Sequence, residues 1–183
     1  MIMDEMLAHN MDFVKNKEYE KYKTSKIPNK GITVITCMDT RLIELLPQAL
    51  GFKNGDVKII KNAGGMITSP FDSTVRSALI SVYEQGVAEI MVIGHKDCEV
   101  TDVSSKTITE RMLERGITQE TLDMISYCEV DMEKWLAGFD SVEESVKNSV
   151  NILKNHPLMP KDVHIAGYII DIVTGGLKKV PLN

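Results

Sequence analysis

The sequence predicts a single-domain α/β fold in which a mainly parallel β-sheet of four to five strands is flanked by helices. Short β-branched or apolar runs alternate along the chain with longer segments of helical periodicity. Such alternation is typical of right-handed βαβ units, which build parallel sheets with helices on their faces. The chain has 183 residues, of which 43% are hydrophobic and 26% charged. This length and composition fit one globular domain and exclude a disordered chain.

Each element is predicted from a local pattern. Bounded apolar runs predict buried strands over residues 32–36, 57–60, 89–93, 163–170 and 177–180. The last of these strands is short and follows a glycine turn. Helical periodicity predicts the intervening helices over residues 1–23, 44–50, 71–85, 107–115, 118–136 and 141–155. Gly51 and Gly86 follow two of these helices and are expected to end them, while Ser141 begins a capping box.

Charge and cysteine content exclude several classes of function. The formal net charge is −5, so we expect no general attraction to nucleic acid or to an anionic membrane. No apolar run approaches the length of a membrane span, and the first ten residues contain acidic side chains but no apolar core typical of a signal peptide. Three cysteines are too few for a disulfide scaffold. We therefore expect a reducing, cytoplasmic setting, in which cysteines serve metal binding or catalysis.

Three potential metal ligands follow two of the predicted strands. Cys37 ends the run at 32–36, and His95 and Cys98 follow the run at 89–93. Because ligands bind beyond the carboxyl ends of parallel strands, these side chains would converge if the two strands are neighbours. Two thiolates and one imidazole form a reasonable zinc site with an open fourth position, as in catalytic zinc sites. From spacing alone, simple burial of the cysteines is an equally good interpretation.

Two further groups of residues lie at the same predicted edge. Asp39 and Arg41 follow Cys37 and form either a loop salt bridge or a dyad in which Arg41 orients the carboxylate beside the metal. The run Asn62, Ala63, Gly64 and Gly65 follows the second strand. It is either a tight loop or a wall of the substrate pocket, because glycines permit close backbone approach. The chain contains no phosphate-binding glycine motif, which argues against a nucleotide-binding domain.

The remaining cysteine and histidines have no ligand-like spacing. Cys128 lies within the predicted helix 118–136 and is expected to be an inert, buried or half-buried thiol. His156 precedes a proline at a helix end and is expected to be a capping or surface residue. His9 and His164 are isolated in the sequence.

Taken together, these motifs resemble the β-class carbonic anhydrases, and most closely their short bacterial and archaeal form. The resemblance rests on the run TCMDTRL at 36–42, on Gly55-Asp56 with KNAG at 61–64, and on Gly94-His95-x-x-Cys98. Weaker similarity continues through residues 75–77 and 167–175, so it spans nearly the whole chain in order. The combination of CxDxR with HxxC is a specific signature.

The resemblance implies a function and a role for each matched residue. Cys37, His95 and Cys98 would bind Zn²⁺, and Asp39 and Arg41 would be the catalytic dyad. The reaction would be the reversible hydration of carbon dioxide to bicarbonate and a proton. In a closed state, Asp39 would leave Arg41 and become a fourth zinc ligand. The resemblance further implies a homodimer or an assembly of dimers, in which residues 1–23 form an arm on the partner subunit and residues 24–183 form the catalytic domain.

Two departures and two rival functions accompany this interpretation. Glu99 stands where the family usually has glycine, and Gly65 stands where it usually has asparagine or alanine. Glu99 is predicted to begin a short helical turn over 99–103, against the alternatives of a strained backbone or a charge that tunes the site. The rival functions are hydrolysis of carbonyl sulfide or carbon disulfide at the same zinc, and a zinc-binding relative without catalytic activity.

Overall fold

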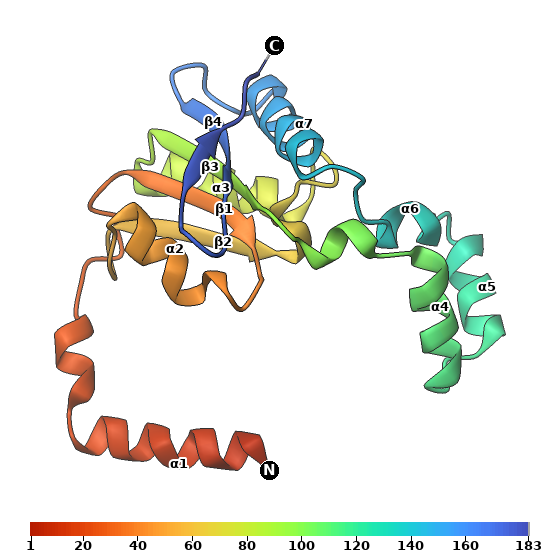
Figure 1. Ribbon diagram of the computed structural model, residues 1–183, viewed down its shortest axis with the longest axis horizontal. Coiled ribbons are helices and arrows are strands. Elements are labelled where there is room, and N and C mark those ends of the chain that lie inside the picture. The colour runs from red at the N-terminus through yellow and green to blue at the C-terminus, as the bar shows by residue number, and fades with distance from the viewer. Residues whose placement is uncertain (183) are drawn as a thin grey trace.

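Five strands form one sheet in the computed structural model, which describes residues 1–182 (Figure 1). The strand order is β2-β1-β3-β4-β5; the first four strands are parallel, and β5 runs antiparallel to β4. The strands are β1 (Ile32–Cys37), β2 (Val57–Asn62), β3 (Glu89–His95), β4 (His164–Ile170) and β5 (Leu177–Lys179). The predicted fold class, an α/β domain with a mainly parallel sheet of four to five strands, is confirmed.

Seven α-helices and three short 3-10 helices connect and flank the strands within the described residues. The α-helices are α1 (Ile2–Lys15), α2 (Leu42–Leu50), α3 (Ser73–Gln85), α4 (Ser105–Glu114), α5 (Gln119–Tyr127), α6 (Met132–Leu136) and α7 (Val142–Asn155). The 3-10 helices are η1 (Glu18–Tyr22), η2 (Ala63–Gly65) and η3 (Glu99–Asp102). Gly51 and Gly86 end α2 and α3 in the left-handed conformation, with φ of 63° and 67°, as glycine at this position favours.

Two predicted helices are each divided in two. The segment 1–23 breaks after α1, where Lys17 has a left-handed φ of 57° before η1 begins. In the segment 118–136, α5 ends at its C-cap, Cys128. Glu129 follows with a left-handed φ of 61°, and α6 begins at Met132. Asp131 caps α6 by accepting a hydrogen bond from the Lys134 amide. A favourable N-cap in the middle of an otherwise periodic segment therefore explains the break.

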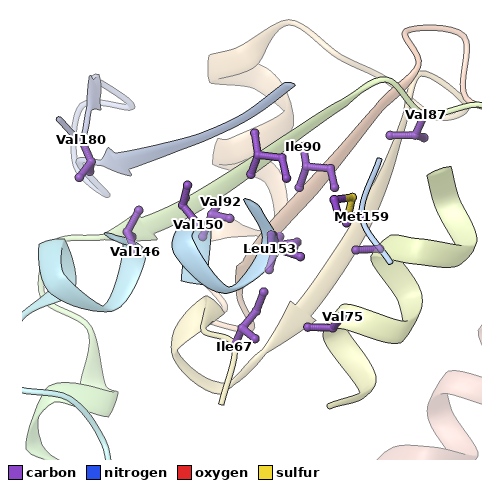
Figure 2. Packing of buried hydrophobic residues seen from close by; sticks show 13 residues of the cluster. Ile67, Val75, Val87, Ile90, Val92, Val146, Val150, Leu153, Met159 and Val180 are labelled. Atoms are coloured by element: carbon purple, nitrogen blue, oxygen red, sulfur yellow. The ribbon is translucent and has the colours of Figure 1, made fainter. Parts of the chain in front are cut away.

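The sheet is covered on both faces. Helices α3 and α7 pack on one face with Ile35 of β1 and Val92 of β3, and α2 packs on the other through Leu42 and Leu46. Figure 2 shows the first cluster, with side chains from α7, α3 and β3 directed toward one another: Val146, Val150, Leu153, Val75, Ile90 and Val92. Burial on both faces explains why the central strands are continuous apolar runs.

This packing places the carboxyl ends of β1 and β3 side by side. Thr36 of β1 is paired with Ile93 of β3, and its hydroxyl donates to the Ile93 carbonyl at 3.0 Å. The residues that follow these positions therefore meet at one edge of the sheet. Two segments project from the body (Figure 1): the N-terminal arm with α1, and the helices α4–α6. Within residues 1–182, no helix combines the length and the apolarity that crossing a membrane requires.

Candidate metal centre

Three ligand side chains converge at the carboxyl edge of the sheet. Cys37 is the last residue of β1, His95 is the last residue of β3, and Cys98 follows in the adjoining turn. All three are buried, and their ligand atoms lie within 4.8 Å of one another. The two Sγ atoms are 4.0 Å apart. Zn–S bonds of about 2.3 Å in a tetrahedron require roughly 3.8 Å between sulfurs, so the site fits a zinc ion with little adjustment.

The imidazole of His95 is oriented for metal binding. Its Nδ1 lies 2.9 Å from the carbonyl oxygen of Lys96, which acts as acceptor for the Nδ1–H group. Nε2 then carries the lone pair, and within residues 1–182 it is buried without a hydrogen-bond partner. A carbonyl contact at the ring nitrogen that does not bind the metal fixes the tautomer of a metal-binding histidine. A bound cation would satisfy the lone nitrogen acceptor.

The two thiols differ in acidity although they are neighbours. Burial alone would raise the pKa of Cys37, but contacts with His95 and with the backbone amides of Asp39 and Gly64 lower the pKa to about 7. Burial raises the pKa of Cys98 to about 11, and the negative charges of Cys37 and Asp39 add to this effect. The first thiolate therefore forms at Cys37, and a metal ion is needed to stabilise the second charge beside it.

A carboxylate and a guanidinium lie next to these ligands. Asp39 accepts hydrogen bonds from Arg41 at three nitrogens: the backbone amide at 2.8 Å, Nε at 3.0 Å and Nη2 at 2.7 Å. These contacts lower the pKa of Asp39 to about 2, so the carboxylate is ionised at neutral pH. Its Oδ2 lies 3.7 Å from Nε2 of His95. The carboxylate thus faces the ligand cluster while Arg41 holds it from the other side.

Asp97 is a residue of the site that the sequence analysis missed. Its carboxylate accepts from Nη1 of Arg41 at 2.8 Å, and its carbonyl accepts from Nη2 at 2.8 Å. Asp97 is also the residue of the loop with a left-handed backbone, with φ of 55°. The guanidinium is therefore held between Asp39 and Asp97. An acidic residue between the two ligands of an HxxC motif was the signal that could have identified it.

Glu99 adopts an ordinary helical backbone. It is the first residue of η3, and the positive φ belongs to Asp97 two positions earlier. The predicted helical turn is confirmed, and the strained backbone is excluded. Glu99 is exposed and lines the cavity above the ligands.

The segment 62–65 forms a tight loop that packs against the end of β1. Asn62 is paired with Cys37 in the sheet, and its side chain holds both the carbonyl (2.8 Å) and the amide (3.0 Å) of Met66. This closes the loop so that Gly65, with φ of 61°, lies on the backbone of Thr36 and Cys37. A Cβ atom at Gly65 would come within 2.7 Å of the Cys37 nitrogen. Gly64 and Gly65 are thus buried behind the ligand.

Two neighbouring cavities open at this edge. The first, of about 450 Å³, is lined by Cys37, Asp39, Arg41 and Cys98, among others. The second, of about 560 Å³, is lined by Asn62 and Ala63 on one side and by the apolar side chains Val103, Ile108, Trp135 and Leu136 on the other. Met38, Glu99 and Val100 line both cavities. A cavity with one apolar wall therefore adjoins the ligand cluster, and its polar lining includes Asp72 and Glu99.

The other cysteine and histidines lie away from the cluster, and the expectation that Cys128 is buried or half-buried is wrong. Cys128 is exposed at the end of α5, because the helix that was expected to bury it ends there. His156 is only 2% exposed; its ring packs edge-on against Phe71, and its Nδ1 accepts from the Leu158 amide at 3.2 Å. It does stand at the C-cap of α7, as expected.

The fold and the site define an α/β protein whose Cys₂His centre could hold a metal ion at the carboxyl edge of a parallel sheet. A family model described as carbonic anhydrase matches residues 32–177. The Trichomonas vaginalis β-carbonic anhydrase isoform I has a crystal structure similar to this chain, with a TM-score of 0.88 at 34% identity, over 97% of this chain and 96% of that one. The chain therefore belongs to the β-carbonic anhydrase family.

Two proteins that are similar in sequence to this chain are named for different reactions. YtiB of Bacillus subtilis (strain 168), named as a candidate carbonic anhydrase, is 49% identical over 176 residues, which cover 96% of this chain and 94% of that protein. A carbon disulfide hydrolase of Acidianus sp. (strain A1-3) is 34% identical over 176 residues, with 89% and 84% covered. The family therefore includes more than one named reaction on a similar chain.

Proposed function

We propose that the protein is a zinc-dependent enzyme that hydrates carbon dioxide reversibly to bicarbonate and a proton. The observation that carries this proposal is the buried cluster of Cys37, His95 and Cys98, with an ionised Asp39 carboxylate facing it. Zinc held by these three ligands would act as a Lewis acid that makes hydroxide available from water near neutral pH. A site with three protein ligands keeps a fourth position free for this chemistry.

Asp39 and Arg41 would orient the nucleophile. An ionised carboxylate can only accept hydrogen bonds, so Asp39 accepts one from the attacking oxygen and directs its remaining lone pair into the cavity. Arg41 keeps this carboxylate ionised and immobile through paired charge-assisted bonds. Asp97 holds Arg41 as well, because its carboxylate accepts from Nη1 and its carbonyl accepts from Nη2. In the structure the carboxylate is bound to Arg41, and we propose that it can also turn toward the metal as a fourth ligand.

The apolar wall of the adjoining cavity supports a small, uncharged linear substrate. Its lining includes Val103, Ile108 and Trp135, which offer dispersion contacts but no charge. Carbon dioxide fits this description, and so do carbon disulfide and carbonyl sulfide. Because an Acidianus relative is named a carbon disulfide hydrolase, hydrolysis of these sulfur compounds is our second candidate function. Parallel turnover measurements with carbon dioxide, carbonyl sulfide and carbon disulfide separate the two.

We further infer that the enzyme is a homodimer or an assembly of dimers. Helix α1 has no buried residue, although one side of it carries large apolar side chains such as Met3, Met6 and Leu7. A second copy would cover this surface. Residues 1–23 would then be an arm on the partner, and the rest of the chain the catalytic domain. We also propose a cytoplasmic location, because Cys37 and Cys98 must remain reduced to bind metal.

The test is stopped-flow hydration of carbon dioxide with protein of measured zinc content. We expect turnover that scales with zinc occupancy in the wild type and in Cys128→Ser, and that is lost in Cys98→Ser. Protein that contains one zinc per chain but hydrates carbon dioxide no faster than buffer would refute the proposal. In that case, turnover of carbon disulfide would favour the second candidate, and no turnover of any of the three would favour a non-catalytic zinc protein.

A further inference from the structure

Residues 99–140, which we call the insert, leave the metal centre and return to it. They form η3 and the helices α4–α6, which project from the body in Figure 1. The insert begins directly after the ligand Cys98, and its two ends meet because the Gly138 amide donates to the Val103 carbonyl at 3.4 Å. A Cβ atom at Gly138 would also collide with the Val100 carbonyl oxygen. We call these contacting residues, together with the next one along the chain, the neck: Val100, Val103, Gly138 and Phe139.

Phe139 of the neck packs on the loop that lies behind Cys37. A Cβ atom at Gly64 would come within 2.8 Å of Cε1 of Phe139 and within 3.3 Å of Cγ1 of Val100. The ring of Phe139 therefore lies where a side chain at position 64 would be. Gly64 has a left-handed φ of 79°, a conformation that glycine adopts without steric cost. A residue without a side chain thus lets the ring contact the backbone of this loop directly.

The other side of the same loop contacts Cys37. A Cβ atom at Gly65 would come within 2.7 Å of the Cys37 nitrogen, so the two backbones touch. Although burial raises the pKa of Cys37, contacts with the His95 imidazole and with two backbone amides, one of them that of Gly64, lower it. The Gly64 amide therefore lies near the sulfur that would bind the metal. Gly64 is thus held between the ring of Phe139 and the Cys37 ligand.

The neck also packs beside the second sulfur ligand. Val100 and Phe139 are half-buried and pack against the cluster of buried residues that contains both Cys37 and Cys98. The Cys98 carbonyl accepts from the Thr101 hydroxyl at 2.7 Å and from the Thr101 amide at 3.0 Å, which fixes the start of the insert. Because buried side chains are closely packed, a shift of one ring displaces its neighbours. The position of Phe139 therefore affects the surroundings of both thiolates.

The insert also supplies the apolar wall of the second cavity. Phe139 follows the last helix of the insert, from which part of this wall comes. The contact of Phe139 with Gly64 therefore ties the wall to the loop behind the metal ligand. The wall residues on the insert are Val103, Ile108, Trp135, Leu136 and Ala137.

We propose that Phe139 is a positioning residue of the metal centre, which presses the Gly64 loop against Cys37 and so fixes the orientation of this ligand toward the metal. The inference rests on the zinc site of the proposed function and adds a residue from outside the ligand motifs. Groups that orient metal ligands typically contribute about 10–100-fold to metal affinity. Because Phe139 acts through Gly64, we expect a contribution of about tenfold, at the lower end of this range.

The first test measures zinc affinity by competition with a chelator in Phe139→Leu and Phe139→Ala. Leucine keeps part of the apolar volume and alanine removes nearly all of it, so the loss should be graded. We expect the dissociation constant for zinc to rise about tenfold in Phe139→Leu and further in Phe139→Ala. Circular dichroism checks the fold, and the leucine variant decides the test if the alanine variant does not fold. A leucine variant that binds zinc as tightly as the wild type would overturn the proposal.

Phe52→Leu is the matched control. Phe52 belongs to the same buried cluster and is 9% exposed. It lies between α2 and the start of β2, at the edge of the sheet opposite to the metal centre. The two leucine variants lose the same atoms from one cluster, so both should melt at a lower temperature than the wild type. Only Phe139→Leu is expected to bind zinc more weakly. An equal loss of zinc affinity in Phe52→Leu would show general destabilisation and overturn the proposal.

The second test examines the ligand geometry with Co²⁺ in place of zinc. The absorption bands of thiolate-bound Co²⁺ depend on the type and arrangement of its ligands. We expect the charge-transfer and d–d bands of Phe139→Leu to differ from those of the wild type, and the bands of Phe52→Leu to match them. A purely structural role of Phe139 predicts wild-type bands in every molecule that is folded and loaded. Wild-type bands in Phe139→Leu would therefore overturn the proposal, even if its zinc affinity had fallen.

These measurements do not depend on turnover. A chain that shows the expected affinities and spectra but does not hydrate carbon dioxide would refute the proposed reaction and leave the role of Phe139 intact. A wild-type chain that binds neither zinc nor Co²⁺ would refute the zinc site, and with it this inference.

Discussion

Replacing Arg41 by methionine tests whether the guanidinium sustains the charge on Asp39. In the wild type, hydrogen bonds and charge from Arg41 lower the pKa of Asp39 from 3.8 to about 2. Each unit corresponds to about 1.4 kcal/mol, so the pair stabilises the folded protein by at most about 2.5 kcal/mol at neutral pH. Arg41 is 39% exposed, and solvent screening reduces the expected loss to about 1–2 kcal/mol.

The sign of the pH dependence follows from the lowered pKa. A carboxylate whose folded pKa is depressed contributes its stability above the unfolded value near 4 and loses it as the pH falls toward 2. The stability difference between wild type and Arg41→Met is therefore expected to be constant from pH 7 to about 5 and to shrink below pH 4. Urea denaturation of the metal-free proteins measures it at each pH.

Arg76→Met is the matched control, because Arg76 is an exposed arginine of α3 that forms no ion pair within the described residues. It is expected to change the free energy of unfolding by less than about 0.5 kcal/mol. If Arg41→Met is as stable as Arg76→Met at pH 7, Arg41 does not hold Asp39 in the way described. Carbon dioxide hydration should also fall in Arg41→Met and remain unchanged in Arg76→Met.

Four further outcomes are expected. Cys98→Ser should lose most of its bound zinc, whereas Cys128→Ser should keep it, as metal analysis can show. X-ray absorption of the zinc-loaded wild type should show a shell of two sulfurs and one nitrogen. Zinc affinity should fall as the pH drops below about 11, where protons compete for the thiolate of Cys98, and more steeply below about 7, where they also compete for that of Cys37; chelator competition measures it, and an affinity independent of pH would contradict the ligand set. Gly65→Ala should reduce both stability and zinc content, since its Cβ would press on the Cys37 backbone. Leu153→Ala should lower the free energy of unfolding by about 2–5 kcal/mol without loss of zinc in the folded protein, as urea denaturation can show.

Much of the fold and the ligand set could be predicted from the sequence because short-range patterns encode them. The β-branched run at 32–36 and the apolar run at 89–93 predict two strands, and Cys37 and His95 occupy their ends. Parallel strands place their carboxyl ends at one edge of the sheet. Because these two strands are neighbours, Cys37 and His95 lie close together there. Asn62 was likewise expected at this edge of the sheet because it follows the predicted strand at 57–60, and it is the last residue of β2.

Other features were outside the reach of local patterns. Cys128 is exposed as the C-cap of α5, and the chain begins a new helix, α6, after the N-cap Asp131. His156 is buried because Phe71 and the turn after α7 pack around it, although its sequence neighbours suggest a surface position. The burial of His156 depends on contacts between segments that the periodicity of one segment does not contain, whereas the exposure of Cys128 accompanies a helix break within its own segment.

The sequence by itself determined which residues could bind a metal and on which elements they lie, because strand ends, glycine stops and ligand spacing are local properties. Only the tertiary structure decided how these residues act together. It brought β1 beside β3, so that two sulfurs lie 4.0 Å apart, and it placed Asp97 across from Asp39 so that Arg41 is held from both sides. Distances between side chains that are 56 or more positions apart depend on strand order and register, and folding alone sets these.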